Sequence, residues 1–424
     1  MRVCLFEDRR VEDLEPLTLT RPAHDLLCGL GSLAARQWRY FAPCSAGVLV
    51  RPDLADLQRQ RSGIAVNDLA WLRTGPAVLV NSRWLPPPGS AADLSRPCVA
   101  TVGDEVAYTV VTPEHLALCS PETIDECAEN WKSTLPRHEA GGTLVRHLWE
   151  LVDRNGEQIT LDHEQTAGRR GIGTGPGVAV VGPRERLVID PTATLDPMVV
   201  IDTTNGPVVI DAEAVVTAFT RLEGPCYVGP HCHVLGAKVR AGTTLGPSCR
   251  IGGEIEASIV QGHSNKYHDG FLGHAYVGEW VNLGAGTSNS DLRNDYGEVT
   301  VTVAGRRVAT GRSKVGCFLG DHTKSGLGTL LNTGTSAGVF CNLLPSGGLL
   351  PKYVPAFCSV WNGALTENID CPALLETARK VMDRRGVDLT SEHEELYRAL
   401  LSRTARERQR ALREAEQRRL RRSA

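Results

Sequence analysis

Long hydrophobic segments are missing from this sequence of 424 residues. No apolar run reaches the roughly 18–20 residues that a membrane span requires, so no membrane-spanning helix is expected. Net charge is also nearly absent, because the formal charge is −3 at pH 7. Nucleic-acid binding depends on neutralising many phosphates, and the overall charge gives no support for it. The composition therefore predicts a soluble protein with neither a membrane span nor a nucleic-acid partner.

Paired cysteine motifs are lacking as well, although the chain contains 13 cysteines. They are scattered as single residues without a Cys-x-x-Cys pair, unlike a metal site or a disulfide framework. The N-terminus becomes charged too early for the hydrophobic region of a secretory signal. We therefore expect reduced thiols and a cytoplasmic location. The segment His231-Cys232-His233 lacks a second ligand pair at zinc-site spacing, so no metal is assigned to it.

The second half of the chain shows a six-residue rhythm of apolar side chains. The positions are Ile189, Leu195 and Ile201, then Ile210, Val216, Leu222, Val228 and Val234 after a three-residue insertion, and finally Leu245 and Ile251. Such hexapeptide repeats are typical of a parallel β-helix, in which stacked coils share one continuous core. A β-sandwich would instead alternate apolar and polar residues with a period of two. The rhythm predicts a left-handed parallel β-helix over residues 181–360.

The first part of the chain has a different pattern. Val3–Phe6 and Ala77–Val80 predict short buried strands, and the stretch Gly31–Phe41 between them resembles a helix. We therefore expect an α/β domain with a mostly parallel sheet over residues 1–167. A helix from Leu148 is expected to end at Asn155-Gly156. The glycines between 168 and 177 predict a linker, which we place at residues 168–180.

A short segment after the first predicted strand contains Pro16-Leu17-Thr18 followed by Arg21-Pro22. This pattern resembles the signature of sugar-1-phosphate nucleotidyltransferases and stands where that family has it. The resemblance implies a nucleoside triphosphate and Mg²⁺ as ligands of an N-terminal nucleotidyltransferase-like domain. It also suggests Asp8, Arg9, Arg21 and Asn81 as residues of a nucleotide or sugar site.

The N-terminal domain departs from that family at three places, one of which is Ala23, where the family has a lysine that meets phosphate. The family has a glycine-rich loop that binds triphosphate oxygens, whereas Phe6–Leu14 contains no glycine. The family also has a metal-binding aspartate at the end of the strand that corresponds to Ala77–Val80, where this chain has Asn81, and Mg²⁺ prefers carboxylate oxygen. Two interpretations stay open for this domain: an altered phosphate site, or a fold that has lost its chemistry.

The segment Ser264–Thr287 places a titratable histidine, His268, within the six-residue rhythm. Its part from Phe271 to Thr287 is similar to the acetyltransferase half of bifunctional GlmU enzymes. These enzymes pair glucosamine-1-phosphate acetyltransferase with N-acetylglucosamine-1-phosphate uridyltransferase. With Asn294-Asp295-Tyr296 and the segment 320–324, the likeness extends to GlmU-family sugar nucleotidyltransferases over roughly residues 1 to 390.

The resemblance implies an acetyl-CoA-dependent N-acetylation of an amino-sugar-1-phosphate, with His268 as the catalytic base. A histidine that titrates near pH ~6.5 suits this role, because only the unprotonated amine attacks a thioester. Substrate-binding positions transfer to Arg240, Lys266, Asn282, Asn294 and Tyr296. The family's trimeric assembly, with active sites between subunits, implies a homotrimer. Two further positions, Ser258 and Phe271, differ from the family.

Other roles remain open for several of these residues. His268 would also suit an exposed corner of a β-helix, and Asn282 would suit a stabilising asparagine ladder. For the whole chain, the alternative to an enzyme is a non-catalytic sugar-nucleotide-binding or scaffold protein that keeps both folds.

Two further elements are predicted after the histidine segment. The alternating Val/Thr run that begins at Glu298 predicts a β-hairpin arm between residues 288 and 313, reaching over a ligand or toward a neighbouring subunit. A helical tail is expected over residues 361–424, from the spacing of apolar residues in Ala373–Met382 and the acidic start at Ser391–Leu396. The arginine-rich end from Leu401 could bind nucleic acid or an acidic lipid, but no aromatic residue is interleaved for base stacking, and a solvated helix face is the simpler explanation.

Overall fold

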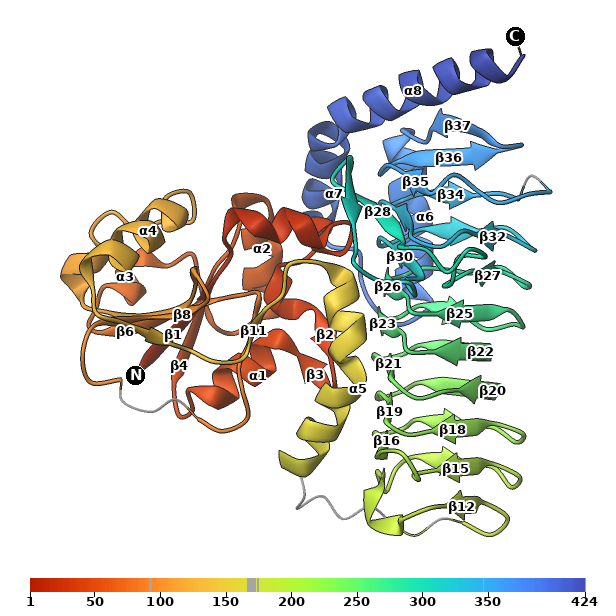
Figure 1. Ribbon diagram of the computed structural model, residues 1–424, viewed down its shortest axis with the longest axis horizontal. Helices are drawn as coiled ribbons and strands as arrows, with labels where there is room; N and C mark the ends of the chain where they lie inside the picture. Colours follow the sequence, from red (N-terminus) through yellow and green to blue (C-terminus); the bar gives the residue numbers. More distant parts are fainter. Residues whose placement is uncertain (91–93, 166–172, 174, 346, 424) are drawn as a thin grey trace.

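The computed structural model describes residues 1–90, 94–165, 173, 175–345 and 347–423. An α/β domain comes first, a tall stack of parallel strands follows, and three helices end the chain (Figure 1). Within these described residues, no helix combines the length and the hydrophobicity needed to cross a bilayer. Part of the predicted linker, 168–172 and 174, lies outside the described residues.

The N-terminal domain is built on a seven-stranded sheet with β1 (Arg2–Phe6) between β6 (Ala77–Asn81) and β4 (Ser45–Leu49). β1 pairs in parallel with both neighbours, as expected from two buried apolar strands. The remaining strands are β5 (Ala65–Val66) on one side, and β9 (Glu105–Val111), β8 (Cys98–Val102) and β10 (Arg137–Glu139) on the other. β9 runs antiparallel to β6 and β8, so the sheet is mixed rather than uniformly parallel.

Five helices belong to this domain: α1 (Leu33–Tyr40), α2 (Pro52–Arg61), α3 (Leu69–Leu72), α4 (Ile124–Thr134) and α5 (Leu148–Gln165). α1 begins at Ser32, whose side chain accepts a hydrogen bond from the backbone N–H of Ala35. α5 lies between the sheet domain and the strand stack (Figure 1).

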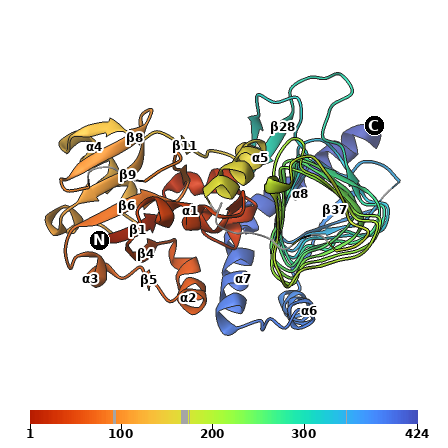
Figure 2. The same cartoon turned by 90° about the horizontal axis from the view of Figure 1, so that it is seen from below.

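The second half of the chain forms the expected left-handed parallel β-helix, whose coils superimpose as a triangle when viewed along the stack (Figure 2). One face, the domain face, packs on the N-terminal domain. Its strands are β13 (Leu187–Ile189), β16 (Val208–Ile210), β19 (Cys226–Val228), β21 (Thr243–Leu245), β23 (Ile259–Gly262), β26 (Tyr276–Glu279), β30 (Cys317–Leu319), β33 (Thr335–Ala337) and β35 (Tyr353–Val354).

The other two faces share the long strands β20 (His233–Val239) and β22 (Arg250–Glu256), which bend around a corner. The outer face holds their second halves with β12 (Ala179–Val181), β15 (Val200–Asp202), β18 (Arg221–Glu223), β25 (Phe271–Gly273), β27 (Ser288–Asn289) and β32 (Leu330–Leu331). The groove face holds their first halves with β14 (Thr194–Leu195), β17 (Val215–Val216), β24 (Asn265–Lys266), β31 (Lys324–Ser325), β34 (Asn342–Leu343) and β36 (Cys358–Trp361).

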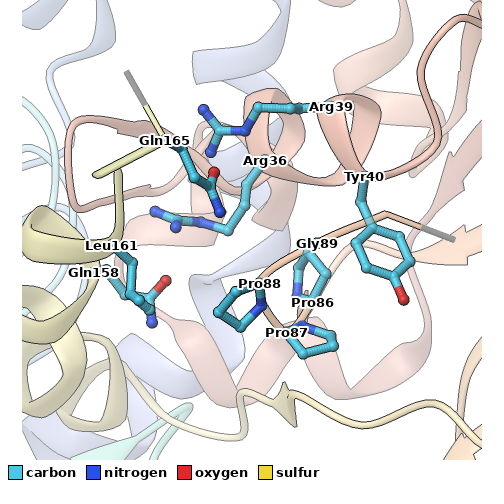
Figure 3. Close-up of a pocket in the computed structure, with 10 residues that line it drawn as sticks. All are labelled: Arg36, Arg39, Tyr40, Pro86, Pro87, Pro88, Gly89, Gln158, Leu161 and Gln165. Carbon is cyan, nitrogen blue, oxygen red and sulfur yellow. The ribbon is translucent and has the colours of Figure 1, made fainter. Parts of the chain in front are cut away.

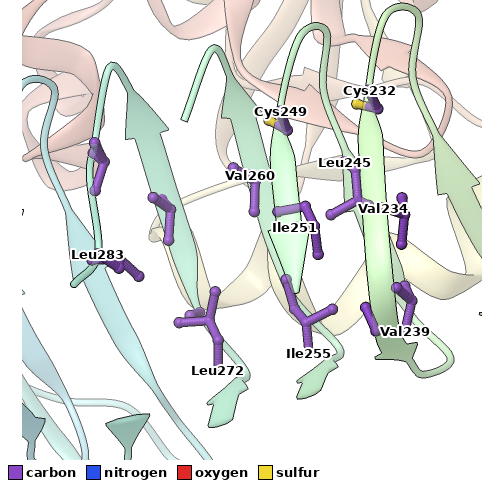
Figure 4. Close-up of a cluster of buried hydrophobic side chains, with 14 of the residues drawn as sticks. Cys232, Val234, Val239, Leu245, Cys249, Ile251, Ile255, Val260, Leu272 and Leu283 are labelled. Carbon is purple, nitrogen blue, oxygen red and sulfur yellow. The ribbon is translucent and has the colours of Figure 1, made fainter. Parts of the chain in front are cut away.

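The six-residue rhythm corresponds to the interior of this β-helix. Nine of its ten apolar residues are buried in one continuous core, and the tenth, Leu195, packs against that core from a partly buried position. In Figure 4, Val234 and Ile251 lie in one inward column, and Val239, Ile255 and Leu272 lie in the next. The prediction from periodicity is therefore confirmed, because each coil buries its apolar side chain against the coils above and below.

A column of rings marks the corner between the domain face and the groove face. His263 stacks on Trp280 with ring centroids 4.3 Å apart, and the column continues through His322, Phe340 and Phe357. All five residues have positive φ, between 51° and 61°. This left-handed backbone is costly for side chains other than glycine, and the stacked rings offset part of that cost.

The expected end of the helix at Asn155-Gly156 is wrong, since α5 continues to Gln165. The side chain of Asn155 is fully buried and accepts a hydrogen bond from the backbone N–H of Gly29 at 2.7 Å. Its amide donates to the carbonyl of Gly242 at 2.8 Å. Gly156 lies close to Pro225 and Gly242 of the β-helix. The pair therefore allows close packing between the domains rather than breaking a helix.

Asn155→Ala is expected to lower the free energy of unfolding by about 1–3 kcal/mol, because it leaves buried backbone groups of both domains unsatisfied. Urea denaturation followed by circular dichroism measures this change. Asn130, exposed on α4, provides the matched control, and Asn130→Ala should change stability by less than about 0.5 kcal/mol. Equal effects of the two substitutions would contradict the role given to Asn155.

The predicted hairpin arm is present as β28 (Thr300–Val303) and β29 (Arg306–Ala309), which pair antiparallel. It packs on the N-terminal domain of its own chain, where Arg306 forms an ion pair with Asp13 at 2.6 Å. The arm therefore packs against its own chain, and the expectation that it covers a ligand or reaches a neighbouring subunit stays a prediction.

The helical tail consists of α6 (Cys371–Asp383), α7 (Ser391–Arg403) and α8 (Ala405–Ser423), and it follows a last hairpin strand, β37 (Ala364–Glu367). α7 packs on α2, with Arg61 and His393 in contact at 2.9 Å. Tyr397 of α7 also contacts His322 of the β-helix at 3.0 Å. The tail thus connects both domains.

Candidate active site

His268 lies in the turn between β24 and β25, where its side chain is exposed. It lines a cavity of about 810 Å³ on the groove face, bordered by the end of α6. The other lining residues are Arg250, His263, Asn265, Tyr267, Trp280, Val281, Asn282, Leu283, Gly284, Ala285, Lys324, Leu327, Val381, Arg384 and Arg385. We call this cavity the α6 groove. Its volume is sufficient for a ligand of coenzyme size.

The α6 groove is strongly cationic. Arg250, Lys324, Arg384 and Arg385 line it, and its described lining residues include no carboxylate. Burial, followed by the like charges of Arg250 and Arg384, lowers the pKa of Arg385. Burial also lowers the pKa of Lys324. Uncompensated like charges attract an anion, so the groove is suited to phosphate groups.

Sequence reasoning did not identify these four cations. The pair Arg384-Arg385 follows α6 directly, and Arg385 donates a hydrogen bond to the side-chain oxygen of Asn265 at 2.6 Å. This contact joins residues 120 positions apart. The sequence carries no periodic signal for such a contact, although two adjacent arginines at a helix end were visible in it.

Asn282 lies in the groove as predicted. Its side-chain oxygen accepts a hydrogen bond from the amide of Asn265 at 3.1 Å, one coil away. Isolated bridges connect Asn265 to Asn282 and Asn282 to Lys324. The result is a short polar ladder along the floor of the groove, which stabilises the stacked coils. Asn282 is nevertheless exposed, so its amide remains beside the cavity.

Lys266 occupies an inward position of the β-helix, paired in register with the core residue Ile251. The side chain is only 4% exposed, and its amine donates to the backbone carbonyls of His268 at 2.6 Å and Gly252 at 3.1 Å. It therefore anchors the turn that carries His268. The expectation that Lys266 binds substrate directly receives no geometric support.

Lys266 should make stability depend on pH in the alkaline range. Burial lowers the pKa of Lys266 to about 8, whereas an unfolded lysine titrates near ~10.4. Between these values the unfolded chain binds more protons, so the contribution of Lys266 to the free energy of unfolding rises with pH. Urea denaturation between pH 7 and 10 should show a smaller rise for Lys266→Met than for the wild type. The control is Lys238→Met, because Lys238 is exposed, and this variant should keep the wild-type rise. If the free energy of unfolding of Lys266→Met rises with pH as much as that of the wild type, the role given to Lys266 is refuted.

Three other predicted residues lie away from the α6 groove within one chain. Arg240 lines a separate cavity of about 210 Å³ on the outer face, where Glu254 and Glu256 lie 3.3 and 3.1 Å from its guanidinium. Asn294 and Tyr296 lie in an exposed turn between β27 and β28. The structure therefore groups only Lys266 and Asn282 with His268.

A further cavity, between α1 and α5, is not a ligand site. It is lined by Arg36, Arg39 and the prolines 86–88, among others (Figure 3). The carboxylate of Asp162 forms ion pairs with Arg36 at 2.8 Å and with Arg39 at 2.9 Å. The cavity volume is about 10 Å³, which suffices for about one water molecule.

In the N-terminal domain, three residues of the expected site line one cavity of about 160 Å³: Asp8, Arg9 and Asn81. It opens at the carboxyl ends of β1 and β6. After β1 the chain adds β4 and β5 on one side of that strand and then places β6 on the other side, so the strand order reverses between β1 and β6. Ligands of open α/β sheets bind at such a position. The oxygens expected to meet Mg²⁺ are occupied, however: Asp8 pairs with Arg83 at 2.6 Å, and the side-chain oxygen of Asn81 accepts from the backbone N–H of Arg83. The cavity as formed does not fit the expected Mg²⁺.

Arg21 does not join that cavity. It is 2% exposed and lies between the domains, with its guanidinium 2.6 Å from Asp321 and 3.0 Å from Glu279 of the β-helix. Burial opposes its charge, but Asp321 and Glu279 more than compensate and raise the pKa of Arg21. Thr20 also donates to Asp321, at 2.7 Å. The signature arginine is therefore an interdomain contact.

Comparison with known proteins gives a family match for the N-terminal domain and partial matches to relatives. Residues 3–170 match the family model described as "Sugar nucleotidyl transferase". A bifunctional sugar-1-phosphate nucleotidylyltransferase/acetyltransferase of Sulfurisphaera tokodaii is 34% identical over 109 residues, 25% of this chain and 27% of that protein. The bifunctional protein GlmU of Paracoccus denitrificans is 30% identical over 175 residues, 36% of this chain and 39% of that protein.

Two solved acetyltransferase structures also match. The polysialic acid O-acetyltransferase OatWY matches at 12% identity and a TM-score of 0.19, over 45% of this chain and 89% of that chain. A mutant GDP-perosamine N-acetyl transferase from Caulobacter crescentus, in complex with CoA and GDP-perosamine, matches at 14% identity and a TM-score of 0.13, over 45% of this chain and 58% of that chain.

The curated matches are partial. The chain spans 27% of the first of these relatives and 39% of the second. The N-terminal domain matches the sugar nucleotidyl transferase family model, and part of the chain is similar to part of the bifunctional proteins.

Proposed function

We propose that the α6 groove transfers an acetyl group from acetyl-CoA to the amine of an amino-sugar-1-phosphate. The observation that carries this proposal is the presence of an exposed histidine and four cations around one cavity of about 810 Å³. The histidine supplies a base, and the cations suit the phosphates of donor and acceptor. The acetyltransferase named among the relatives supports the same reaction.

The reaction requires the acceptor amine to lose protons. His268 accepts a proton as the amine nitrogen attacks the thioester carbonyl, a C–N bond forms, and the C–S bond then breaks. The proton moves from His268 to the departing thiolate, which leaves as free thiol. The exposed amide of Asn282 lies on the same floor and can donate to the carbonyl oxygen as negative charge develops.

The proposal includes a homotrimer in the cytoplasm. A neighbouring subunit would bring Arg240, Asn294 and Tyr296 of another chain toward the α6 groove, which one chain by itself does not do. Light scattering after gel filtration measures the oligomeric state. The described cysteines are all free thiols, which agrees with a reducing compartment.

A non-catalytic role for the whole chain is the second candidate, and the observation that favours it comes from the N-terminal domain. Two of its predicted site residues are engaged elsewhere, since Arg21 pairs with the β-helix and Asp8 pairs with Arg83. These contacts favour a domain that serves as a scaffold or binds a sugar nucleotide without transferring a nucleotidyl group.

The two candidates are separated by an acetyl-transfer assay. Purified protein is incubated with acetyl-CoA and glucosamine-1-phosphate, then with other amino-sugar-1-phosphates, and free thiol is followed with a chromogenic disulfide. We expect thiol release that depends on the amino sugar. Release equal to the sugar-free blank with every amino sugar, between pH 6 and 9, would reject the acetyltransferase and leave the scaffold.

A further inference from the structure

Arg83 lies two residues after β6, beyond the carboxyl end of the strand that pairs with β1. Its side chain is fully buried, which is rare for arginine. The guanidinium points to the place where Asp8, following β1, and Glu105, opening β9, come together. A cation is thus built into the sheet edge where ligands of this class of fold bind.

Each of the three nitrogens of this guanidinium donates at least one hydrogen bond. Nε donates to Asp8 Oδ1 at 2.8 Å, and Nη2 donates to Asp8 Oδ2 at 2.6 Å and to Glu105 Oε2 at 3.0 Å. Nη1 donates to the carbonyl of Val145 at 2.8 Å. The fork on Asp8 is bidentate, the strongest arrangement of a guanidinium and a carboxylate.

Asn81 completes the arrangement. Its amide donates to Asp8 Oδ2 at 2.8 Å, and its oxygen accepts from the backbone N–H of Arg83 at 3.0 Å. The atom that Asn81 turns toward Asp8 is therefore a donor, which a metal ion would repel. Its one possible ligand atom is used within the turn.

A divalent cation here would need the oxygens of Asp8 and Glu105, because these and the other lining carboxylates, Asp104, Asp125 and Glu129, form no group of three possible metal ligands among the described residues. Mg²⁺ requires oxygens at about 2.0–2.1 Å in octahedral geometry, and a fixed positive charge at hydrogen-bond distance from both carboxylates opposes its entry. Burial favours the neutral acid, yet hydrogen bonds from Arg83, followed by Arg146, lower the pKa of Glu105. The positive charge of Arg83 therefore balances negative charge on Asp8 and Glu105 without a metal ion.

We propose that the guanidinium of Arg83 takes the place of a divalent cation in the N-terminal domain, so that the cavity between β1 and β6 works without metal. Any phosphate-bearing ligand of this cavity then meets Arg9 and Arg10 at its rim rather than a metal ion. The domain consequently lacks metal-dependent nucleotidyl transfer. This inference does not depend on acetyl transfer in the α6 groove.

Titration of the full-length protein with Mn²⁺, followed by the electron paramagnetic resonance of the free ion, tests the proposal. The cavity of the wild type should bind no Mn²⁺ at concentrations up to about 1 mM. Arg83→Met releases Asp8 and Glu105 and should bind one additional Mn²⁺ per chain, which Asp8→Asn then removes. The matched control is Arg146→Met, because Arg146 also pairs with Glu105, at 2.7 Å, but is largely exposed; it should bind no additional ion.

The outcomes separate clearly. Wild-type Mn²⁺ binding that Asp8→Asn abolishes would overturn the proposal, whereas binding that survives Asp8→Asn lies elsewhere and agrees with it. A folded Arg83→Met that gains no Mn²⁺ would also overturn it, because the two carboxylates would then form no cation site. If circular dichroism shows that Arg83→Met does not fold, the comparison of wild type with Asp8→Asn decides by itself.

Discussion

Replacement of His268 with alanine is expected to lower the rate of acetyl transfer by about 10²–10⁴-fold, the usual contribution of a general base. The side chain is exposed on a turn, so its loss should leave the stability of the β-helix unchanged. The rate constant of thiol release at saturating substrates is the measurement. The deficit should shrink as pH rises, because the acceptor amine then loses its proton without the help of a base.

His231 provides a matched control for this experiment. It is an exposed histidine at a corner of the same β-helix, 3.1 Å from Glu213 and outside the lining of the α6 groove. His231→Ala should keep the wild-type rate. If His268→Ala also keeps it while the wild type is active, the histidine is a corner residue and another group supplies the base.

Replacement of Arg21 with methionine should lower the free energy of unfolding by about 3–5 kcal/mol, the cost of leaving a buried charge without its partner. Asp321 is 3% exposed, and it would lose both hydrogen bonds from the guanidinium. Guanidinium chloride denaturation followed by tryptophan fluorescence provides the measurement.

Two variants make the Arg21 experiment specific. Arg9→Met removes an exposed arginine of the same domain and should change stability by less than about 0.5 kcal/mol. Adding Asp321→Asn to Arg21→Met should recover part of the loss, because the unpaired carboxylate disappears. A loss below about 1 kcal/mol for Arg21→Met would place this contact with ordinary surface ion pairs.

The sequence predicted the repetitive part of the fold well, because one apolar residue in every six has to face the interior in each coil. Ile210 and Ile251, far apart along the chain, obey the same rule. Local residue preferences predicted the wrong secondary structure where the two domains are in contact. Asn155-Gly156 looked like a helix end, but buried hydrogen bonds to Gly29 and Gly242 outweigh the preference of these residues for turns.

The candidate site was predicted only where its residues are neighbours in the repeat. His268, Lys266 and Asn282 come from two successive coils, so periodicity brought them together. Arg384 and Arg385 of the α6 groove directly follow a helix that comes more than 100 residues later in the chain, since Arg385 and Asn265 are 120 positions apart. The motif containing Arg21 identified a family resemblance, whereas the role of that arginine depends on Asp321, which lies outside the motif.

The interdomain contact of Arg21 also has a consequence for synthesis on the ribosome. The arginine is made 300 residues before Asp321 and lies among the first elements to fold. Until the sixth strand of the domain face, which ends with Glu279, has followed it, its guanidinium has no carboxylate from the β-helix, and Asp321 comes only after the seventh strand. During synthesis the N-terminal domain therefore exposes the surface around Arg21, which the β-helix covers in the folded protein. The domain reaches its final state only after most of the β-helix has been made.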